Sequence, residues 1–314
     1  MAVEYAIETE GLTRKFGGFT AVENLTLKVK KGELFGFLGP NGAGKTTTIR
    51  MLTTLIAPTS GGATVGGHDI YKEPSKVRSV IGVVPQQFAL FDELTPVENL
   101  KYIGQLYGMG APEIARKTRE FLEIVDLWDK KDVQSGGFSG GMKQRLSVAA
   151  GLLHEPEILF MDEPTTGLDP HSRIALRELT RELNRKNGIT VVYTTHDMEE
   201  ADKLCDRIGI MNKAVMVEVD TPGALKAMLP QRTRVDLRVS RGPKNVAELL
   251  KRQDFVAAVH PEGVRLVVEM KGGQNSVCAL NNWLYTRKVE LADMHVRETS
   301  LEDVFIHLTS GENG

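Results

Sequence analysis

Gly39-Pro40-Asn41-Gly42-Ala43-Gly44-Lys45-Thr46 is the stretch that decides the fold of this 314-residue chain. Its spacing is that of a phosphate-binding loop: glycine, four residues, then Gly-Lys and a serine or threonine. The apolar run over residues 33–38 is typical of a buried parallel strand, and residues 46–52 can begin a helix. Such a turn presents unpartnered backbone N–H groups and the positive end of a helix dipole to an anion. The stretch therefore predicts a nucleotide phosphate site.

The residue types in this loop suit a triphosphate and a magnesium ion. Glycines let the backbone wrap phosphates closely, because they have no side chain and tolerate left-handed backbone angles. Lys45 is expected to reach the β- and γ-phosphates, and Thr46 to bind Mg²⁺ through its hydroxyl. The alternative is an ordinary glycine-rich turn with a surface lysine, which leaves the flanking strand and helix unexplained.

The composition argues against several classes of protein. The chain has 39 basic and 41 acidic residues, a formal charge of −2, so no nucleic acid is expected as a partner. Its two cysteines, Cys205 and Cys278, show no metal-ligand spacing, and reduced thiols in a cytoplasmic protein are expected. We expect no signal peptide, and no run of about 18 apolar residues predicts a membrane span. A role at a membrane would therefore require another chain.

Antiparallel strands are predicted over residues 5–32, before the phosphate loop. Leu25, Leu27 and Val29 alternate with polar neighbours, which is the pattern of a half-buried strand. Phe16 lies at a glycine-containing turn in this region. It has two interpretations, stacking on an adenine ring or ordinary packing.

A helical insert is predicted over residues 95–153. Thr95-Pro96-Val97-Glu98 is a capping box with proline at the first helical position, so a helix begins there. Amphipathic helices are expected over residues 96–108 and 112–127. No strand is predicted within the insert, which would therefore form a helical subdomain inside an α/β domain.

A second glycine-rich helix start follows within residues 134–145. Ser139 is a good N-cap, and Gly140 and Gly141 leave backbone N–H groups open to an anion. Capped helices that begin with glycine are common, so this signal is weak when taken alone. Together with the phosphate loop it indicates a second phosphate contact.

Paired acids end an apolar strand predicted over residues 157–163. Ligands of open parallel sheets bind at the carboxyl ends of the strands, and that is where Asp162 and Glu163 would lie. One acid can hold Mg²⁺, and the other can orient or deprotonate an attacking water. Two solvated acids at a strand end would be the interpretation if the phosphate loop were absent.

Two more polar residues follow predicted buried strands. Gln86 comes after the strand over residues 79–84, and His196 follows the strand over residues 189–194. A lone histidine at a strand end is usually structural. His196 becomes a candidate γ-phosphate contact because the other elements of a nucleotide site are present.

Residues 3–228 resemble the ATP-binding subunit of an ABC transporter. The motifs occur in that family's order: the phosphate loop, the glutamine after Pro85, the signature over residues 138–142, the strand-end acids and His196. The resemblance extends to the daunorubicin-resistance and sodium-efflux type of exporter ATPase, whose members have a sequence similar to that of residues 299–305. It implies a P-loop NTPase fold with a mixed sheet, an antiparallel β subdomain, a helical insert and a small C-terminal α+β domain.

The resemblance also implies roles for particular residues, with ATP and Mg²⁺ as cofactors. The expected nucleotide contacts are Phe16, Gly39, Asn41, Gly42, Ala43, Gly44, Lys45, Thr46 and Thr47. Thr46, Gln86 and Asp162 would serve the magnesium ion. Glu163 would be the catalytic base, assisted by Gln86 and His196. Ser139, Gly140 and Gly141 would bind the γ-phosphate of ATP held by a second, facing copy.

The expected partners are a second nucleotide-binding domain, which makes a homodimer, and an integral-membrane subunit that holds the chain at the cytoplasmic face of the membrane. The alternative function is a soluble ABC-type ATPase in DNA repair or translation. Repair members carry long coiled coils between the phosphate loop and the signature, and translation members usually carry two cassettes. Neither feature is found in this sequence.

The nucleotide-binding domain is expected to span residues 1–229 and an accessory domain residues 230–314. Alternating apolar residues and helical stretches in the tail predict the order βαββαβ, closed by a helix from about residue 300. This order suggests a small ferredoxin-like domain. An interaction or dimer-supporting module is favoured over a ligand sensor.

Overall fold

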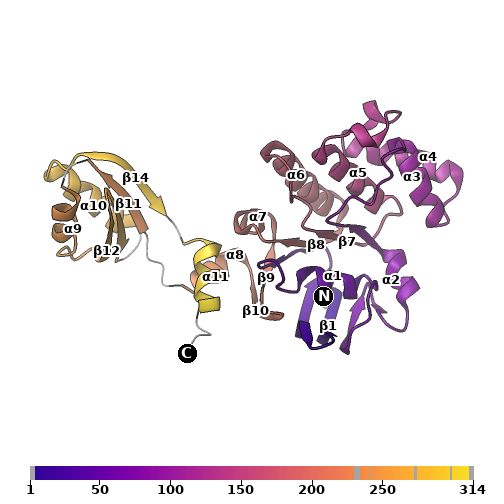
Figure 1. Cartoon of the computed structure of the whole chain (residues 1–314), viewed down its shortest axis with the longest axis horizontal. Coiled ribbons are helices and arrows are strands. Elements are labelled where there is room, and N and C mark those ends of the chain that lie inside the picture. Colours follow the sequence, from indigo (N-terminus) through magenta and orange to yellow (C-terminus); the bar gives the residue numbers. More distant parts are fainter. Residues whose placement is uncertain (1–3, 230–233, 241, 272–273, 298, 311–314) are drawn as a thin grey trace. The chain divides into compact units, whose positions relative to one another are not determined.

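The computed structural model describes residues 4–229, 234–240, 242–271, 274–297 and 299–310 (Figure 1). The chain divides into two compact units, residues 1–222 and residues 223–314. The division falls after Pro222, earlier than the boundary expected at residue 229. Helix α8 (Pro222–Ala227) therefore belongs almost entirely to the second unit.

A six-stranded sheet forms the centre of the first unit. Its order is β10 (Val215–Asp220), β9 (Arg207–Asn212), β3 (Leu34–Leu38), β8 (Thr190–Thr195), β7 (Ile158–Asp162) and β6 (Ile81–Val84). All neighbours are parallel except β10 and β9, which form an antiparallel hairpin. Every residue of β3, β7 and β8 is buried, as expected for parallel strands that are covered on both faces. The hairpin of β9 and β10 was not among the predicted strands.

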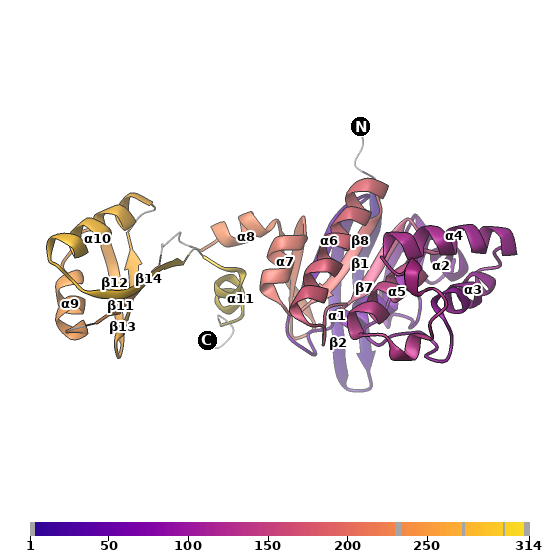
Figure 2. The same ribbon diagram turned by 90° about the horizontal axis from the view of Figure 1, so that it is seen from above.

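A four-stranded antiparallel sheet forms a second layer. Its order is β2 (Phe19–Lys30), β1 (Tyr5–Phe16), β4 (Ser60–Val65) and β5 (His68–Asp69). Side chains from this sheet, from β3 and from α1 (Lys45–Leu52) form one buried core cluster, with Leu12, Phe37 and Ile49 among its members. Helix α6 (Pro170–Asn187) covers the opposite face of the central sheet (Figure 1 and Figure 2). The first helix after the phosphate loop is therefore held between two sheets.

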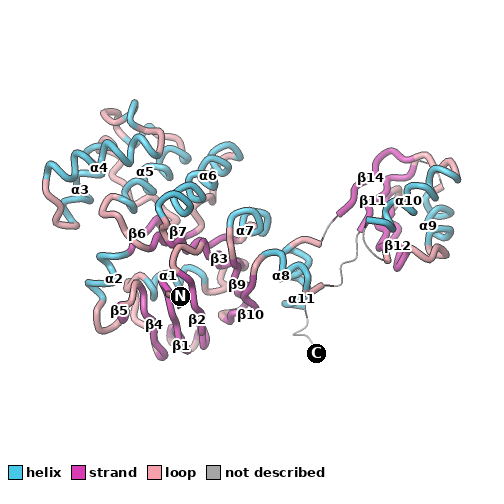
Figure 3. Tube along the Cα trace, turned by 180° about the vertical axis from the view of Figure 1, so that it is seen from behind, coloured by secondary structure: helices cyan, strands magenta, loops and turns pink. Residues whose placement is uncertain are grey.

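The helical insert lies at the β6 edge of the central sheet and contains helices and loops without a strand (Figure 3). Its helices are α3 (Pro96–Leu106), α4 (Ala111–Ile124) and α5 (Gly140–Leu152), with short 3-10 turns at Trp128–Lys130 and Ser135–Gly137. The capping box is present, because the Thr95 hydroxyl accepts from the Glu98 N–H and the Glu98 carboxylate accepts from the Thr95 N–H.

One strand begins later than the sequence predicted. A strand was expected from residue 79, but Ser79 and Val80 end the helix α2 (Pro74–Val80), and β6 begins at Ile81. The proline at the start of α2 favours a helix there, and the apolar run alone did not reveal this. The remaining helix of the unit is α7 (Met198–Leu204).

The second unit contains a four-stranded sheet, and the two helices that connect its strands pack on one face of it. The order along the chain is β11 (Arg234–Val239), α9 (Pro243–Leu250), β12 (Val256–Glu262), β13 (Arg265–Met270), α10 (Gln274–Thr286), β14 (Leu291–Arg297) and α11 (Leu301–Ser310). All neighbouring strands are antiparallel, in the order β12-β13-β11-β14. Val235 and Leu237 of the sheet form a buried core with Leu250, Leu280 and Trp283 of α9 and α10.

Helix α5 packs on the central sheet through glycine. A Cβ added to Gly82 of β6 would lie 2.1 Å from the carbonyl oxygen of Gly151 in α5. This clash is with backbone, which cannot swing aside as the end of a flexible side chain can. The small residues therefore set how closely α5, whose N-terminus carries Ser139, approaches the sheet.

We predict that Gly82→Ala lowers the free energy of unfolding by about 2 kcal/mol, because the methyl group must displace the α5 backbone. Gly62→Ala is the matched control, since Gly62 also lies in a strand and has nothing within 4 Å of an added Cβ. The control should change stability by less than about 0.5 kcal/mol. Urea denaturation of both variants measures the difference, and equal stabilities would contradict the packing argument.

Candidate functional site

The phosphate loop connects the carboxyl end of β3 to the first turn of α1. Gly42 and Gly44 have φ angles of 82° and 108°, in the left-handed region that favours glycine. A Cβ at Gly44 would lie 2.5 Å from the carbonyl oxygen of Ala21, so the loop also needs glycine there for space. The loop is thus shaped by close packing against β2, and its backbone surrounds a hollow.

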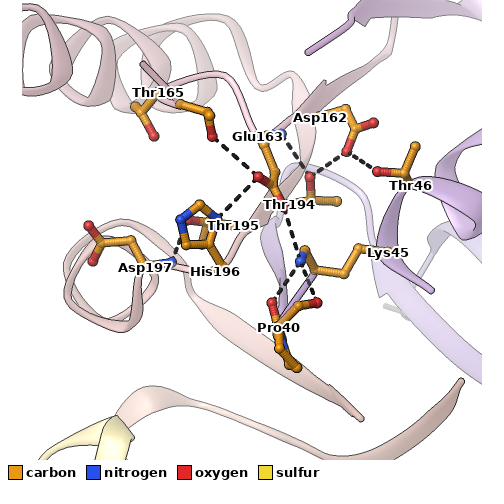
Figure 4. Close-up of polar contacts among 12 residues, drawn as sticks. Pro40, Lys45, Thr46, Asp162, Glu163, Thr165, Thr194, Thr195, His196 and Asp197 are labelled. Carbon is orange, nitrogen blue, oxygen red and sulfur yellow. Dashed lines mark hydrogen bonds and ion pairs between the residues drawn. The ribbon is translucent and has the colours of Figure 1, made fainter. Parts of the chain in front are cut away.

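Lys45 lies folded back across this loop (Figure 4). Its side chain is 4% exposed, and its Nζ donates to the carbonyl oxygens of Gly39 at 2.6 Å and Pro40 at 3.1 Å. It also forms an ion pair of 3.1 Å with Oε1 of Glu163, a residue 118 positions away in the sequence by their numbering. A buried ammonium group is costly unless it is paired and hydrogen-bonded, and these three contacts compensate for its burial.

Asp162 and Thr46 meet at the carboxyl end of β7. The Thr46 hydroxyl donates to Oδ1 of Asp162 at 3.0 Å, and the Thr194 hydroxyl donates to the same oxygen at 2.7 Å. Hydroxyl and carboxylate oxygens are ligands that Mg²⁺ accepts, usually with substrate phosphates and water completing its shell. The described residues contain no group of three or more His, Cys, Asp or Glu side chains that could hold a metal. The donor set thus fits a magnesium ion that arrives with a nucleotide.

Glu163 lies between Lys45 and His196. Its Oε2 is 3.1 Å from Nδ1 of His196 and accepts a hydrogen bond from the Thr166 hydroxyl at 3.2 Å. Burial raises the pKa of Glu163, but the hydrogen bonds and charges of Lys45 and His196 outweigh burial and hold this pKa below its ordinary value. The carboxylate is therefore ionised at neutral pH. A Glu163 φ angle of 44° puts this non-glycine residue in the left-handed region, where strain often accompanies function.

One hollow brings most of the predicted nucleotide residues together. Its lining consists of Phe19, Ala21, Asn41, Gly42, Ala43, Gly44, Lys45, Thr46, Thr47, Gln86 and Glu163. Gln86 is exposed and approaches from β6, on the side of the helical insert. Gly39 lies beneath, with its carbonyl oxygen bound to Lys45. Asp162 and His196 contact residues of the lining without belonging to it.

The two aromatic residues at the tip of the β1–β2 hairpin differ in what they contact. Phe16 does not line the hollow, and its ring is covered by the Arg14 guanidinium, 4.4 Å from the ring centroid. Phe19 pairs with Phe16 across the hairpin, is 63% exposed and does line the hollow. We had not predicted Phe19. A second aromatic within the same turn was the signal that would have indicated it.

Ser139, Gly140 and Gly141 do not line the hollow of their own chain. Ser139 caps α5 by accepting the N–H of Met142 at 3.3 Å. A Cβ at Gly141 would lie 2.2 Å from the Ser172 hydroxyl of α6, so the two helix starts touch. This second glycine-rich helix start is therefore not part of the hollow that the chain's own phosphate loop lines.

The sequence of this chain is similar to those of known ATP-binding proteins. The family model described as ABC transporter matches residues 22–166. The linearmycin resistance ATP-binding protein LnrL of Bacillus subtilis (strain 168) is 38% identical over 305 residues, 96% of this chain and 98% of that one. This chain belongs to the ATP-binding proteins of ABC transporters. As a member of that family it is an ATPase, and these comparisons give no support to the DNA-repair alternative.

Other family members extend the comparison. The daunorubicin/doxorubicin resistance ATP-binding protein DrrA of Streptomyces peucetius is 38% identical over 309 residues, 97% of this chain and 92% of that one. The dimeric, post-hydrolysis structure of the ATP-binding cassette MJ0796 bound to ADP and Pi aligns with a TM-score of 0.62 at 28% identity, covering 68% of this chain and 98% of that one. In the part of this ABC protein that the structure describes, no helix is long and apolar enough to cross a membrane.

We predict that the Glu163 ion pair makes the nucleotide-free ABC protein sensitive to acid. A carboxylate whose pKa is lowered by folding stabilises the fold above its ordinary pKa of 4.5, and this effect is lost as the pH falls through the lowered pKa. The melting temperature of Glu163→Gln should therefore lie below that of the wild type near neutral pH. The gap should close as the pH falls below 4.5, and a gap that widens with acid would contradict the assignment.

Proposed function

We propose that this chain is the motor subunit of an exporter and that it hydrolyses MgATP between two copies of itself. The observation that carries the proposal is the convergence of Lys45, Glu163 and His196 beside the phosphate loop, with contacts of 3.1 Å on both sides of the Glu163 carboxylate. Thr46 and Asp162 supply the oxygen ligands for a magnesium ion. The bound ion would neutralise phosphate charge during hydrolysis.

Lys45 and Glu163 impose an order on the reaction. The ammonium group of Lys45 forms an ion pair of 3.1 Å with the carboxylate that would serve as base. When phosphate oxygens enter the loop, the lysine is expected to turn to them, because they carry more charge than one carboxylate. Oε1 of Glu163 is then free to accept a proton from water while that water attacks the γ-phosphorus. The bond to the β-phosphate breaks, and ADP and inorganic phosphate leave.

Gln86 and His196 have supporting roles in the proposed hydrolysis. Gln86 lines the hollow two residues after β6 ends, where it would assist in holding a bound magnesium ion and the attacking water. His196 contacts Glu163 through Nδ1, which leaves its other ring nitrogen for the γ-phosphate. Phe16 or its neighbour Phe19 would stack on the adenine ring, and the position of Phe19 at the hollow favours Phe19.

The second anion-binding helix end supports a dimer. Ser139, Gly140 and Gly141 do not line the hollow of their own chain, so we propose that they contact the γ-phosphate in a facing copy. The solved relative MJ0796 is described as dimeric, which supports this arrangement. We further propose that residues 230–314 help to hold the two copies together.

An exposed aromatic patch beside Gln86 suits a membrane partner. Phe88 and Phe91 are 39% and 47% exposed, and Phe91 packs edge-to-face on Tyr102 of α3 with centroids 5.0 Å apart. Exposed apolar side chains close to charged ones, here Asp92 and Glu93, commonly mark docking sites. We propose that a membrane subunit docks here and holds the chain at the cytoplasmic face. The cargo would be a compound of the kind named in the relatives, such as linearmycin or daunorubicin.

We predict that Glu163→Gln binds ATP normally but lowers turnover by about 100-fold, the scale of losing a general base. Lys45→Ala should instead weaken nucleotide binding, because it removes the charge that meets the phosphates. Equilibrium ATP binding and steady-state hydrolysis, measured on both variants, separate the two roles. Near-normal hydrolysis by Glu163→Gln would refute the proposed function.

We predict that Glu163→Gln forms a dimer when ATP is present and that adding Ser139→Arg prevents it through bulk and charge at the interface. Gly110→Arg is the matched control, since Gly110 is the exposed N-cap of the neighbouring helix α4 with a φ angle of −72° that arginine can adopt. Size-exclusion chromatography with and without ATP gives the result. A dimer that survives Ser139→Arg would exclude the proposed phosphate contact.

A further inference from the structure

Glu200 is a buried carboxylate that the proposed chemistry does not use. It is the third residue of α7 and is 3% exposed. Its Oε1 accepts the Tyr193 hydroxyl at 2.8 Å, and its Oε2 accepts the hydroxyls of Thr195 at 2.7 Å and Thr165 at 3.0 Å. No ion pair joins Glu200 to a basic side chain within the described residues. Three hydroxyl donors thus take the place that a cation usually has beside a buried carboxylate.

Two of these donors belong to the turns that carry the proposed catalytic groups. Thr165 lies two residues after Glu163, in the turn between β7 and α6. Thr195 directly precedes His196 at the end of β8, and its hydroxyl also accepts the N–H of Asp197 at 3.0 Å (Figure 4). A single oxygen, Oε2 of Glu200, therefore connects the turn that carries Glu163 to the turn that carries His196.

The turn that carries Glu163 needs such a tie. The left-handed backbone of Glu163, with φ of 44°, is unfavourable for a residue with a side chain. The N–H of Glu163 donates to the Thr194 hydroxyl at 2.8 Å, and the carbonyl oxygen of Glu163 accepts the N–H of Thr166 at 3.1 Å. The Thr165 side chain anchors the turn to Glu200. Strained backbone persists only where the surroundings hold it.

We propose that Glu200 is a positioning residue that holds Glu163 and His196 at their working separation. This inference rests on the proposed function, in which Glu163 is the base. A carboxylate suits the task because it only accepts hydrogen bonds, so all three hydroxyls must point toward it. Burial, followed by the charge of Glu200, raises the pKa of Tyr193, so this phenol stays protonated and remains a donor.

The test compares two variants of the full-length chain that each remove one hydroxyl from the same carboxylate. Thr165→Val keeps the shape of the side chain but releases the turn of Glu163. Tyr193→Phe is the matched control, because Tyr193 lies within β8 and not on either turn. Thr165→Val should lower kcat about tenfold with unchanged KM for ATP, the scale expected for a slightly misplaced base. Tyr193→Phe should change kcat less than about twofold, whatever it does to the melting temperature.

The conservative variant supplies a second readout. Glu200→Gln keeps one oxygen that can accept both threonine hydroxyls, whereas Glu200→Ala keeps none. Glu200→Gln should therefore retain at least about fivefold more turnover than Glu200→Ala, on the scale of two retained hydrogen bonds. Equal turnover in these two variants would overturn the proposal.

The Glu163→Gln background separates this inference from the proposed function. If Glu200 acts through the base, Thr165→Val should cause no further loss once the base is removed. A further tenfold loss in that background would overturn the positioning role. If Glu163→Gln is inactive while Thr165→Val and Tyr193→Phe have equal turnover, the positioning role fails and the function stands. If Glu163→Gln itself hydrolyses ATP normally, the proposed function fails first.

Discussion

The ion pair between Lys45 and Glu163 is the interaction on which the site depends. It joins the phosphate loop after β3 to the end of β7, two strands that do not neighbour each other in the sheet. The strand between them, β8, contributes Thr194 to the same cluster, and His196 directly follows this strand. Because parallel strands end at one edge of the sheet, three chain segments reach the same few ångströms. The charges of Lys45 and Glu163 compensate one another there.

Close packing keeps this edge of the sheet in place. Gly44 allows the loop to lie against the backbone of Ala21, and Gly82 allows α5 to lie against β6. At Gly141 the start of α5 meets Ser172 at the start of α6. These contacts join the phosphate loop to β2, α5 to β6, and the start of α5 to the start of α6. Close backbone contacts of this kind leave little room for these elements to shift against one another.

Hydroxyl groups join the proposed catalytic segments at places where no charged side chain does so among the contacts described. Thr194 binds both Asp162 and the N–H of Glu163, and Glu200 gathers the hydroxyls of Thr165 and Thr195. Neutral donors hold these turns without adding charge that would compete with the phosphates for Lys45. Among the residues that line the hollow, Lys45 is the basic one.

Local sequence was sufficient for the parts of this protein that short-range chemistry decides. The phosphate loop, the capping box at Thr95, the buried strands and the paired acids are each specified within about ten residues, since spacing, capping and apolar runs act along the chain. The fold class and the family followed from their order. The tertiary structure decided the β9–β10 hairpin, the place of Phe19 at the hollow and the late start of β6. It also decided the contact of Glu200 with Thr165, which joins residues 35 positions apart. No local pattern predicts such a contact, because only the order of strands in the sheet brings those segments together.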